Sequence, residues 1–389
     1  MNFKASNNDK ALIAEVNLLE KTPPTNLIQH LHRSAGTPQS GRATLGMLAF
    51  TCAIITLVIA SVDAYNELPS RQGLLVKVAQ ESWKLTYKRL VSELAPQSRT
   101  GAYNRPLAQY SGAQSLLQES GRYHLYIGNP CPWCHRVALA NAILNLPPFV
   151  TSSSLEDNPL LASKGGWTFS KRNPDPLFNA NDLKAVYDTC SPGYTGKITA
   201  PLLVDKKERK IVSNESKDIV RMMGKLKLKI DPDAINLYPD DLASAINSKN
   251  DWLYTNFNNA VYRAGFATEQ APYDEAVTAV ASALKAIDDT LSESKYINGA
   301  RITESDLFLL PTAVRFDAVY SVLFKCTGLR IADYKNTQRW IRDMYLLPGV
   351  EDTFDLKDAA RSYYQQMFPL NPSRIVPLVH VPSYLQKQI

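Results

Sequence analysis

Two cysteines about one helical turn apart, Cys131 and Cys134, are the side chains of this sequence best suited to chemistry. The thiolate, rather than the thiol, is the nucleophile, and a cysteine ionises near neutral pH when helix N–H groups or cations surround it. His135 and Arg136 follow the pair directly and can add positive charge. The pattern therefore predicts redox or glutathione chemistry, with Cys131 ionising below the usual range of a free thiol.

The elements around the cysteines are predicted to place the first of them at a helix start. Residues 123–127 are typical of a short strand, residues 128–130 of a loop, and the stretch from Pro132 to about Leu146 of a helix. Proline suits the first helical position, because its missing N–H would have no partner there. Cys131 then occupies the N-cap, where the unpaired N–H groups of the first turn point toward its sulfur.

A structural zinc site or two incidental buried thiols are the alternative interpretations of the pair. Zinc would need a second pair of ligands at similar spacing. Cys52, Cys190 and Cys326 are isolated, and the five histidines show no metal-binding spacing. We therefore predict no metal. Five cysteines in 389 residues also indicate a reducing compartment rather than a disulfide-stapled secreted chain.

Length and charge limit the remaining classes of function. A chain of 389 residues with 45% hydrophobic residues can bury two cores, so we expect two domains and a tail. The net charge of +6 is spread along the chain, without a basic stripe interleaved with aromatic residues. Nucleic acid is therefore not an expected partner.

The first part of the sequence differs from the rest. Residues 1–42 are polar and predict a flexible arm, whereas residues 43–62 contain no charged side chain. A helix of that length spans roughly 30 Å, the thickness of a bilayer's hydrocarbon core, so this segment predicts a transmembrane anchor. A buried helix and a cleaved signal peptide are the alternatives, and the flanking charges leave the orientation open. Residues 63–118 predict a connecting helix, over about 74–94, and an extended lead-in.

A hairpin and a helix start are expected to follow the cysteine helix. The apolar run 198–204 predicts a strand in which Pro201 marks either the strand start or a cis bend. Residues 201–212 predict an antiparallel hairpin, and Ser213 or Asn214 can cap the next helix.

The start of that next helix can bind a ligand or only cap itself. Its N–H groups suit a carboxylate, the Ser216 hydroxyl is a further donor, and the Glu215 carboxylate can hold an ammonium group. Such a set would suit the amino acid head of a γ-glutamyl peptide such as glutathione. The residues alone leave both interpretations open.

Beyond Pro239 the pattern is helical throughout. Apolar residues recur at three- and four-residue steps over 273–291, and Thr303 with Asp306 is typical of a capped helix start. The segment 252–266 mixes aromatic and amide side chains, which predicts either core packing or a pocket for an aromatic molecule. These patterns predict a second, all-α domain.

From about Trp83 to Ser373 the chain closely resembles the glutathionyl-hydroquinone reductases, the Xi class of glutathione transferases. In the first half the matching runs are Arg122-Tyr123-His124-Leu125-Tyr126, Cys131-Pro132-Trp133 with His135-Arg136, Gly166-Trp167-Thr168-Phe169 and Val212-Ser213-Asn214-Glu215-Ser216. In the second half they are Asn258-Asn259, Val261-Tyr262, Ala264-Gly265-Phe266, Val314-Arg315-Phe316-Asp317, Phe324-Lys325-Cys326 and Asn371-Pro372. Chance similarity does not produce so many runs in register.

The resemblance implies a fold and a reaction. The implied fold is an α/β thioredoxin-like, glutathione-binding domain over 119–232 and an all-α glutathione-transferase C-terminal domain over 238–347, with a C-terminal extension over 348–389, usually as a homodimer. The implied reaction reduces a glutathionyl-hydroquinone or related aromatic substrate. Cys131 takes the glutathionyl sulfur as a mixed disulfide and releases hydroquinone, and a second glutathione leaves as oxidised glutathione.

The resemblance also assigns residues to roles. Trp167, Ala200, Glu215 and Ser216 would bind glutathione, and Tyr262 and Tyr363 would donate hydrogen bonds to the oxygen of the quinol ring.

The sequence departs from the family in two places. Members commonly have alanine where this chain has Cys134, so Cys134 is a candidate resolving thiol that could expel glutathione by closing an internal disulfide. The apolar segment 43–62 is absent from the soluble members. Its Met47-Leu48-Ala49-Phe50 run faintly resembles the chlorophyll-binding one-helix proteins, but we expect it first to be an anchor.

Three functions compete on this basis. The first is a membrane-anchored reductase whose catalytic body faces the cytosol or the plastid stroma, with the thylakoid as a candidate membrane. The second is a glutaredoxin-like thiol transferase that uses Cys131 and Cys134. The third is a non-catalytic subunit of a membrane complex that keeps a transferase-like body.

Overall fold

A computed structural model describes residues 69–112, 114–158 and 165–385. The predicted arm and the predicted anchor over 43–62 lie outside the described residues. Within the described part, no helix is both long enough and apolar enough to cross a bilayer. Residues 85–389 form one compact unit. Helix α4 runs from Pro69 to Leu94, so it begins earlier than the predicted start near residue 74 and ends at the predicted residue.

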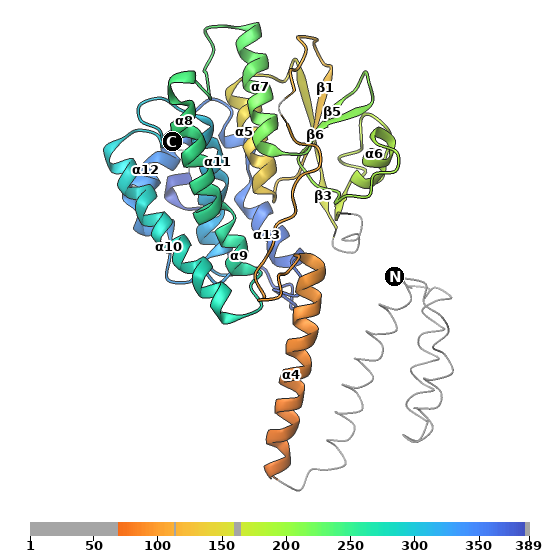
Figure 1. Ribbon diagram of the computed structural model, residues 1–389, viewed down its shortest axis with the longest axis vertical. Helices are drawn as coiled ribbons and strands as arrows, with labels where there is room; N and C mark the ends of the chain where they lie inside the picture. The colour runs from red at the N-terminus through yellow and green to blue at the C-terminus, as the bar shows by residue number, and fades with distance from the viewer. Residues whose placement is uncertain (1–68, 113, 159–164, 386–389) are drawn as a thin grey trace. The chain divides into compact units, whose positions relative to one another are not determined.

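A mixed four-stranded sheet forms the core of the first domain, with the strand order β2-β1-β5-β6 (Figure 1). The strands are β1 (Tyr123–Ile127), β2 (Val150–Ser154), β5 (Leu202–Asp205) and β6 (Lys210–Ser213), and a small second sheet pairs β3 (Glu156–Asp157) with β4 (Trp167–Thr168). β1 is parallel to β2 and antiparallel to β5, and β5 is antiparallel to β6. The predicted strand over 123–127 and the predicted hairpin over 201–212 are both confirmed.

Helices cover both faces of this sheet. The helices are α5 (Pro132–Ile143), α6 (Leu183–Cys190) and α7 (Ser216–Ile230). Strand side chains alternate between faces, so Leu125 and Leu203 belong to the core shared with α5 and α7, whereas Tyr126 and Leu202 belong to the core shared with α6. Figure 1 shows α5 and α7 between the sheet and the helical part of the chain. The helix that carries the cysteines is therefore buried on nearly every side.

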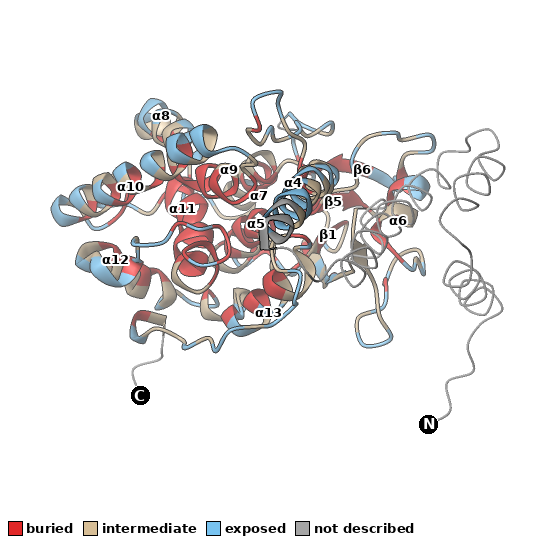
Figure 2. Cartoon of the chain, turned by 90° about the horizontal axis from the view of Figure 1, so that it is seen from below, coloured by how far each residue is buried: buried red, intermediate tan, exposed pale blue. Residues whose placement is uncertain are grey.

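The second domain is all-α, as predicted. Its α-helices are α8 (Ala243–Leu253), α9 (Ala260–Gly265), α10 (Gln270–Glu293), α11 (Glu304–Arg315), α12 (Lys335–Tyr345) and α13 (Leu356–Gln366). Short 3-10 turns are η2 (Asp240–Leu242), η5 (Ile331–Asp333), η6 (Glu351–Thr353) and η7 (Ser383–Leu385). Helix α11 is buried along its whole length, while α8, α10 and α12 each expose one face (Figure 2). The apolar stripe predicted over 273–291 faces the core.

Two π-helical turns interrupt the regular winding of this domain. They are η3 (Tyr254–Asn258), between α8 and α9, and η4 (Phe316–Tyr320), directly after α11. Each turn carries one residue more than an α-helical turn, and such insertions occur frequently at functional sites. The rings of Phe257 and Phe316 stack with their centroids 5.8 Å apart, so the two turns pack against each other. The mixed segment 252–266 therefore spans the first π-helical turn.

Two predicted helix boundaries are corrected by the structure. α5 ends at Ile143 rather than near Leu146, because Asn145 takes a positive φ of 48° that stops the helix. α7 is capped by Glu215, whose side chain accepts a hydrogen bond from the Lys217 N–H, rather than by Ser213 or Asn214. Those two side chains instead bind the backbone of Tyr110 in the lead-in segment.

The start of α11 is fixed by the predicted capping pair. Thr303 and Asp306 form a capping box, and Asp306 also accepts hydrogen bonds from the Ile297 N–H and the Trp340 indole. All of these groups are buried, so the Asp306 carboxylate is the acceptor for donors that water does not reach.

Replacement of Asp306 by alanine is expected to lower the free energy of unfolding by about 3 kcal/mol or more. Each buried donor left without an acceptor costs about 1–3 kcal/mol. Urea unfolding followed by circular dichroism measures the change. Asp289→Ala is the matched control, because Asp289 is exposed and pairs only with Lys285, and it should cost less than about 0.5 kcal/mol. Equal losses in the two variants would contradict the role assigned to Asp306.

Candidate active site

Cys131 lies at the N-cap of α5, as the sequence predicted. Its sulfur accepts a hydrogen bond from the Cys134 N–H at 3.4 Å, and Pro132 begins the helix. On its other side the sulfur lies 3.7 Å from the carbonyl oxygen of Ala200, which precedes the cis bond to Pro201. Cys131 is half-buried and Cys134 is buried. The sulfur therefore lies between a helix start and an extended segment that crosses in front of it.

The surroundings of Cys131 favour its thiolate. Burial raises the thiol pKa, but the Cys134 thiol and N–H donate hydrogen bonds that lower it, and the charges of Arg105 and Arg315 lower it further. The resulting pKa is about 7, below the usual value of a free thiol. Burial and the neighbouring Cys131 raise the pKa of Cys134 well above its ordinary value. The pair thus consists of one sulfur that ionises near pH 7 and one neutral thiol that donates a hydrogen bond to it.

The cations near the sulfur differ from those expected. Burial, with the nearby charge of Arg315, lowers the pKa of His135 well below its usual value, so this histidine is neutral. Burial also lowers the pKa of Arg136 to about 9, and its guanidinium lies between the rings of Trp133 and Phe308. Sequence proximity was therefore misleading, because the charges that act on Cys131 come from the lead-in segment and from the end of α11.

A cavity of about 410 Å³ is lined by Ala200, whose carbonyl oxygen lies 3.7 Å from the Cys131 sulfur, although Cys131 itself is not among the lining residues. Three of the predicted glutathione-binding residues, Ala200, Glu215 and Ser216, line it together with Trp133 and two cationic side chains, Arg105 and Lys197. The Arg105 guanidinium stacks 4.0 Å from the centre of the Trp133 ring. No sequence pattern indicated Arg105 or Lys197, because both lie in irregular segments.

Trp167, the fourth predicted residue, is not among those that line the cavity. Its half-buried ring packs against Gly128, in the loop between β1 and α5, where a side chain larger than hydrogen would collide with it. Trp167 therefore contacts the loop that carries the nucleophile.

The two predicted tyrosines meet in a cluster with a third. The hydroxyl oxygens of Tyr262 and Tyr363 are 2.5 Å apart, and Tyr320 lies 3.3 Å from the first and 3.2 Å from the second. All three are buried, and burial raises the pKa of each, so all three are neutral donors. The charge of Cys131 also raises the pKa of Tyr320, so this tyrosine interacts electrostatically with the nucleophile. Tyr320 was missed because it ends a π-helical turn that periodicity does not reveal.

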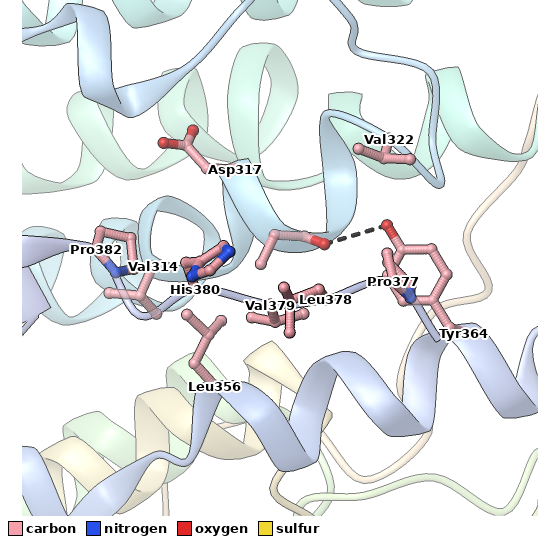
Figure 3. A pocket seen from close by; sticks show the side chains of 11 residues that line it. Val314, Asp317, Val322, Leu356, Tyr364, Pro377, Leu378, Val379, His380 and Pro382 are labelled. Atoms are coloured by element: carbon pink, nitrogen blue, oxygen red, sulfur yellow. Dashed lines mark hydrogen bonds between the residues drawn. The ribbon is translucent and has the colours of Figure 1, made fainter. Parts of the chain in front are cut away.

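A second, smaller cavity of about 170 Å³ lies where the C-terminal extension crosses η4 and α13 (Figure 3). Most of its lining is apolar, and Asp317, Tyr364 and His380 are its titratable members. The Tyr364 hydroxyl at its edge donates to the Ala318 carbonyl at 3.2 Å. Tyr364 thus lies next to Tyr363 in sequence, but its hydroxyl binds the Ala318 carbonyl rather than the hydroxyls of the tyrosine cluster.

Within the described part of the chain, no group of three or more His, Cys, Asp or Glu side chains is placed to hold a metal ion.

Comparison with known proteins agrees with this geometry. The family model for the glutathione S-transferase C-terminal domain matches residues 270–343, which places the helical domain in the glutathione transferase class. Glutathionyl-hydroquinone reductase YqjG of Escherichia coli K12 is 38% identical over 270 residues, which cover 68% of this chain and 81% of that protein.

Solved structures give the same result. The glutathione-bound structure of YqjG from Escherichia coli K-12 has a TM-score of 0.67 and 35% identity, over 75% of this chain and 93% of that one. The Xi glutathione transferase of Phanerochaete chrysosporium has a TM-score of 0.69 and 34% identity. The match covers 74% of this chain and 95% of that one. The chain belongs to the glutathionyl-hydroquinone reductases, the Xi class of glutathione transferases, and is an enzyme of that family.

Alkylation of Cys131 by iodoacetamide is expected to accelerate with pH around a midpoint of about 7, the pKa of its thiol. Cys134 should stay unmodified in the folded protein, because it is buried and its thiol stays protonated. Tandem mass spectrometry of the peptide that contains both cysteines distinguishes them. An alkylation midpoint of about 8.5, the pKa of an unperturbed cysteine, would contradict the site described above.

Proposed function

We propose that this protein reduces glutathionyl-hydroquinones with glutathione, through a mixed disulfide between Cys131 and glutathione. The single observation that carries the proposal is the Cys131 sulfur, held as a thiolate at the N-cap of α5 beside a cavity with groups of both charges. Family membership supports the same activity, because the relative from Escherichia coli is named a glutathionyl-hydroquinone reductase.

Glutathione carries two carboxylates and one ammonium group, and the cavity offers a counterpart for each. The Glu215 carboxylate suits the ammonium, and the Ser216 hydroxyl and the start of α7 suit the carboxylate beside it. Arg105 and Lys197 suit the second carboxylate. The backbone at Ala200 suits the cysteinyl peptide group, which would bring the glutathione sulfur to Cys131. Trp167 would act at the edge of the ligand and through the Gly128 loop.

The proposed reaction has two displacement steps. The Cys131 thiolate attacks the glutathionyl sulfur of the substrate, so a sulfur–sulfur bond forms and the carbon–sulfur bond breaks. The electron pair of that bond goes to the ring carbon, which takes a proton, and hydroquinone leaves. A second glutathione thiolate then attacks the glutathionyl sulfur of the mixed disulfide, which releases oxidised glutathione and restores the Cys131 thiolate.

The tyrosine cluster would assist the first step. Negative charge develops on the quinol ring and its oxygen as the carbon–sulfur bond breaks, and neutral phenols can stabilise that charge with hydrogen bonds. Tyr262 and Tyr363 are the donors proposed for the ring oxygen, and Tyr320 holds both in place.

A glutaredoxin-like thiol transferase is the second candidate, because the Cys134 thiol lies against Cys131. Cys134 would then expel glutathione by closing an internal disulfide. A comparison of the turnover of glutathionyl-menadiol with the turnover of a glutathione mixed disulfide distinguishes the reductase from the thiol transferase. A non-catalytic subunit would instead copurify with a membrane complex and show no turnover.

The homodimer and the membrane anchor over 43–62 remain predictions, together with a reducing compartment. Gel filtration tests the first, and membrane fractionation of the full chain and of a chain lacking residues 1–62 tests the second.

Cys131→Ser is expected to abolish deglutathionylation, whereas Cys134→Ser should keep most of the activity. A serine hydroxyl at 131 is not ionised near neutral pH, while a hydroxyl at 134 still donates to the Cys131 thiolate. Turnover of glutathionyl-menadiol with glutathione measures the effect. Mass spectrometry should also detect an adduct of about 305 Da on Cys131 that further glutathione removes. Equal losses in both variants would make the monothiol scheme wrong.

Tyr262→Phe and Tyr363→Phe are each expected to lower kcat by about a hundredfold, the typical cost of removing one donor to a developing oxyanion. Tyr364→Phe is the matched control on the same helix, because its hydroxyl binds Ala318 away from the cluster, and it should keep the activity. Steady-state kinetics with glutathionyl-menadiol measures all three. If Tyr364→Phe lost as much activity as Tyr363→Phe, the loss in the latter would reflect damage to α13 rather than a missing donor.

A further inference from the structure

Arg315, the last residue of α11, is buried completely and reaches from the helical domain to the loop in front of the nucleophile. Its Nη2 donates to the carbonyl of Asn129 at 2.7 Å, and its Nε donates to the carbonyl of Pro130 at 3.1 Å. Its Nη1 donates to the carbonyl of Pro311, one helical turn back, at 2.9 Å. One planar guanidinium thus joins α11 to the two residues that precede Cys131.

The charge of Arg315 has no carboxylate partner among the described residues. The ion pairs of the described chain do not include it, and its oxygen acceptors are the backbone carbonyls of the loop and of α11. A buried cation without a counter-charge is costly, and neutral acceptors compensate it only in part. The Cys131 residue follows Pro130 directly in the chain. Its anionic sulfur is therefore the candidate counter-charge for the Arg315 guanidinium.

The neighbouring histidine supports this assignment by its own protonation state. The Arg315 Nη1 lies 3.0 Å from His135 Nδ1, and because arginine has no acceptor, His135 Nδ1 must accept. His135 Nε2 then carries the proton and donates to the Thr353 hydroxyl at 3.0 Å. His135 is therefore neutral, so it adds no second positive charge beside the Arg315 guanidinium.

We propose that Arg315 is the positioning residue of this site: its guanidinium fixes the Asn129–Pro130 turn and provides the buried counter-charge of the Cys131 thiolate. Other titratable groups that act on or respond to Cys131 are the Cys134 thiol, Arg105 and Tyr320. Of the two cations, Arg105 lines the cavity and stacks on Trp133, where an incoming peptide can engage it. Arg315 is held by the carbonyls of Asn129, Pro130 and Pro311 and does not line the cavity.

This role would act in both steps of the reaction, and it rests on the proposed function for its catalytic meaning. A stabilised thiolate forms at lower pH for the attack, and it is also the better leaving group when the second glutathione resolves the mixed disulfide. The guanidinium would therefore favour the start and the end of each cycle, when the sulfur is charged.

The test compares Arg315→Gln, Arg315→Lys and Arg221→Gln in the full chain. The readout is the pH midpoint of Cys131 alkylation by iodoacetamide, with kcat for glutathionyl-menadiol as the second measurement. Arg315→Gln should raise the midpoint by up to about one pH unit, the low end of the usual effect of an opposite charge, because the charge of Arg105 remains. Arg315→Lys should raise it less and still lower kcat, because an ammonium cannot bridge both loop carbonyls.

Arg221→Gln is the matched control. Arg221 on α7 is a partly buried arginine and, like Arg315, it joins the two domains, through its ion pair with Glu304. It should lower the melting temperature and leave the alkylation midpoint unchanged. A folded Arg315→Gln protein with the wild-type midpoint would overturn the proposal. If Arg315→Gln does not fold, Arg315→Lys is the deciding variant, and a wild-type midpoint together with a wild-type kcat in that variant overturns the proposal too. The midpoint is measured without substrate, so it is independent of whether Cys131→Ser retains turnover, which is the separate test of the proposed function.

Discussion

A negative charge on a half-buried sulfur is the constraint on which the other features of this protein depend. Taking a thiolate out of water is unfavourable, and burial alone raises the pKa of Cys131. The pKa falls to about 7 because a helix start, a neighbouring thiol and two arginines compensate that loss together. These groups come from three parts of the chain: the helix start and Cys134 from α5, Arg105 from the lead-in segment and Arg315 from α11. The site therefore exists only when both domains are assembled around it.

The interface between the two domains is polar at both ends of α11. Arg315 joins α11 to the active-site loop, and Arg221 on α7 joins the other end of α11, where it pairs with Glu304. Helix α11 is buried along its length, so its two ends present fixed hydrogen-bonding groups to the sheet domain. A rigid central helix suits this purpose, because a thiolate can be stabilised only by groups that do not move away from it.

Much of this could be predicted from local sequence. Cys131 at the N-cap, the hairpin over 201–212, the capping box at Thr303 and the all-α second half depend on neighbours within a few residues, and the structure confirms each of them. The cations could not be predicted in the same way. His135 and Arg136 are adjacent to the cysteines in sequence, yet burial makes one neutral and turns the other toward two aromatic rings. Arg105 and Arg315 reach the sulfur only through tertiary packing.

The two π-helical turns have a consequence for how the aromatic cluster can vary. An α-helix advances by about 100° for each residue, so the extra residue in η3 sets the direction of Tyr262, and the one in η4 sets the direction of Tyr320. Loss of one residue from either turn would restore regular winding and rotate a phenol out of the cluster while leaving the composition of the segment almost intact. Among similar chains, the length of these two turns is thus a sharper marker of an intact phenol triad than the presence of the tyrosines themselves.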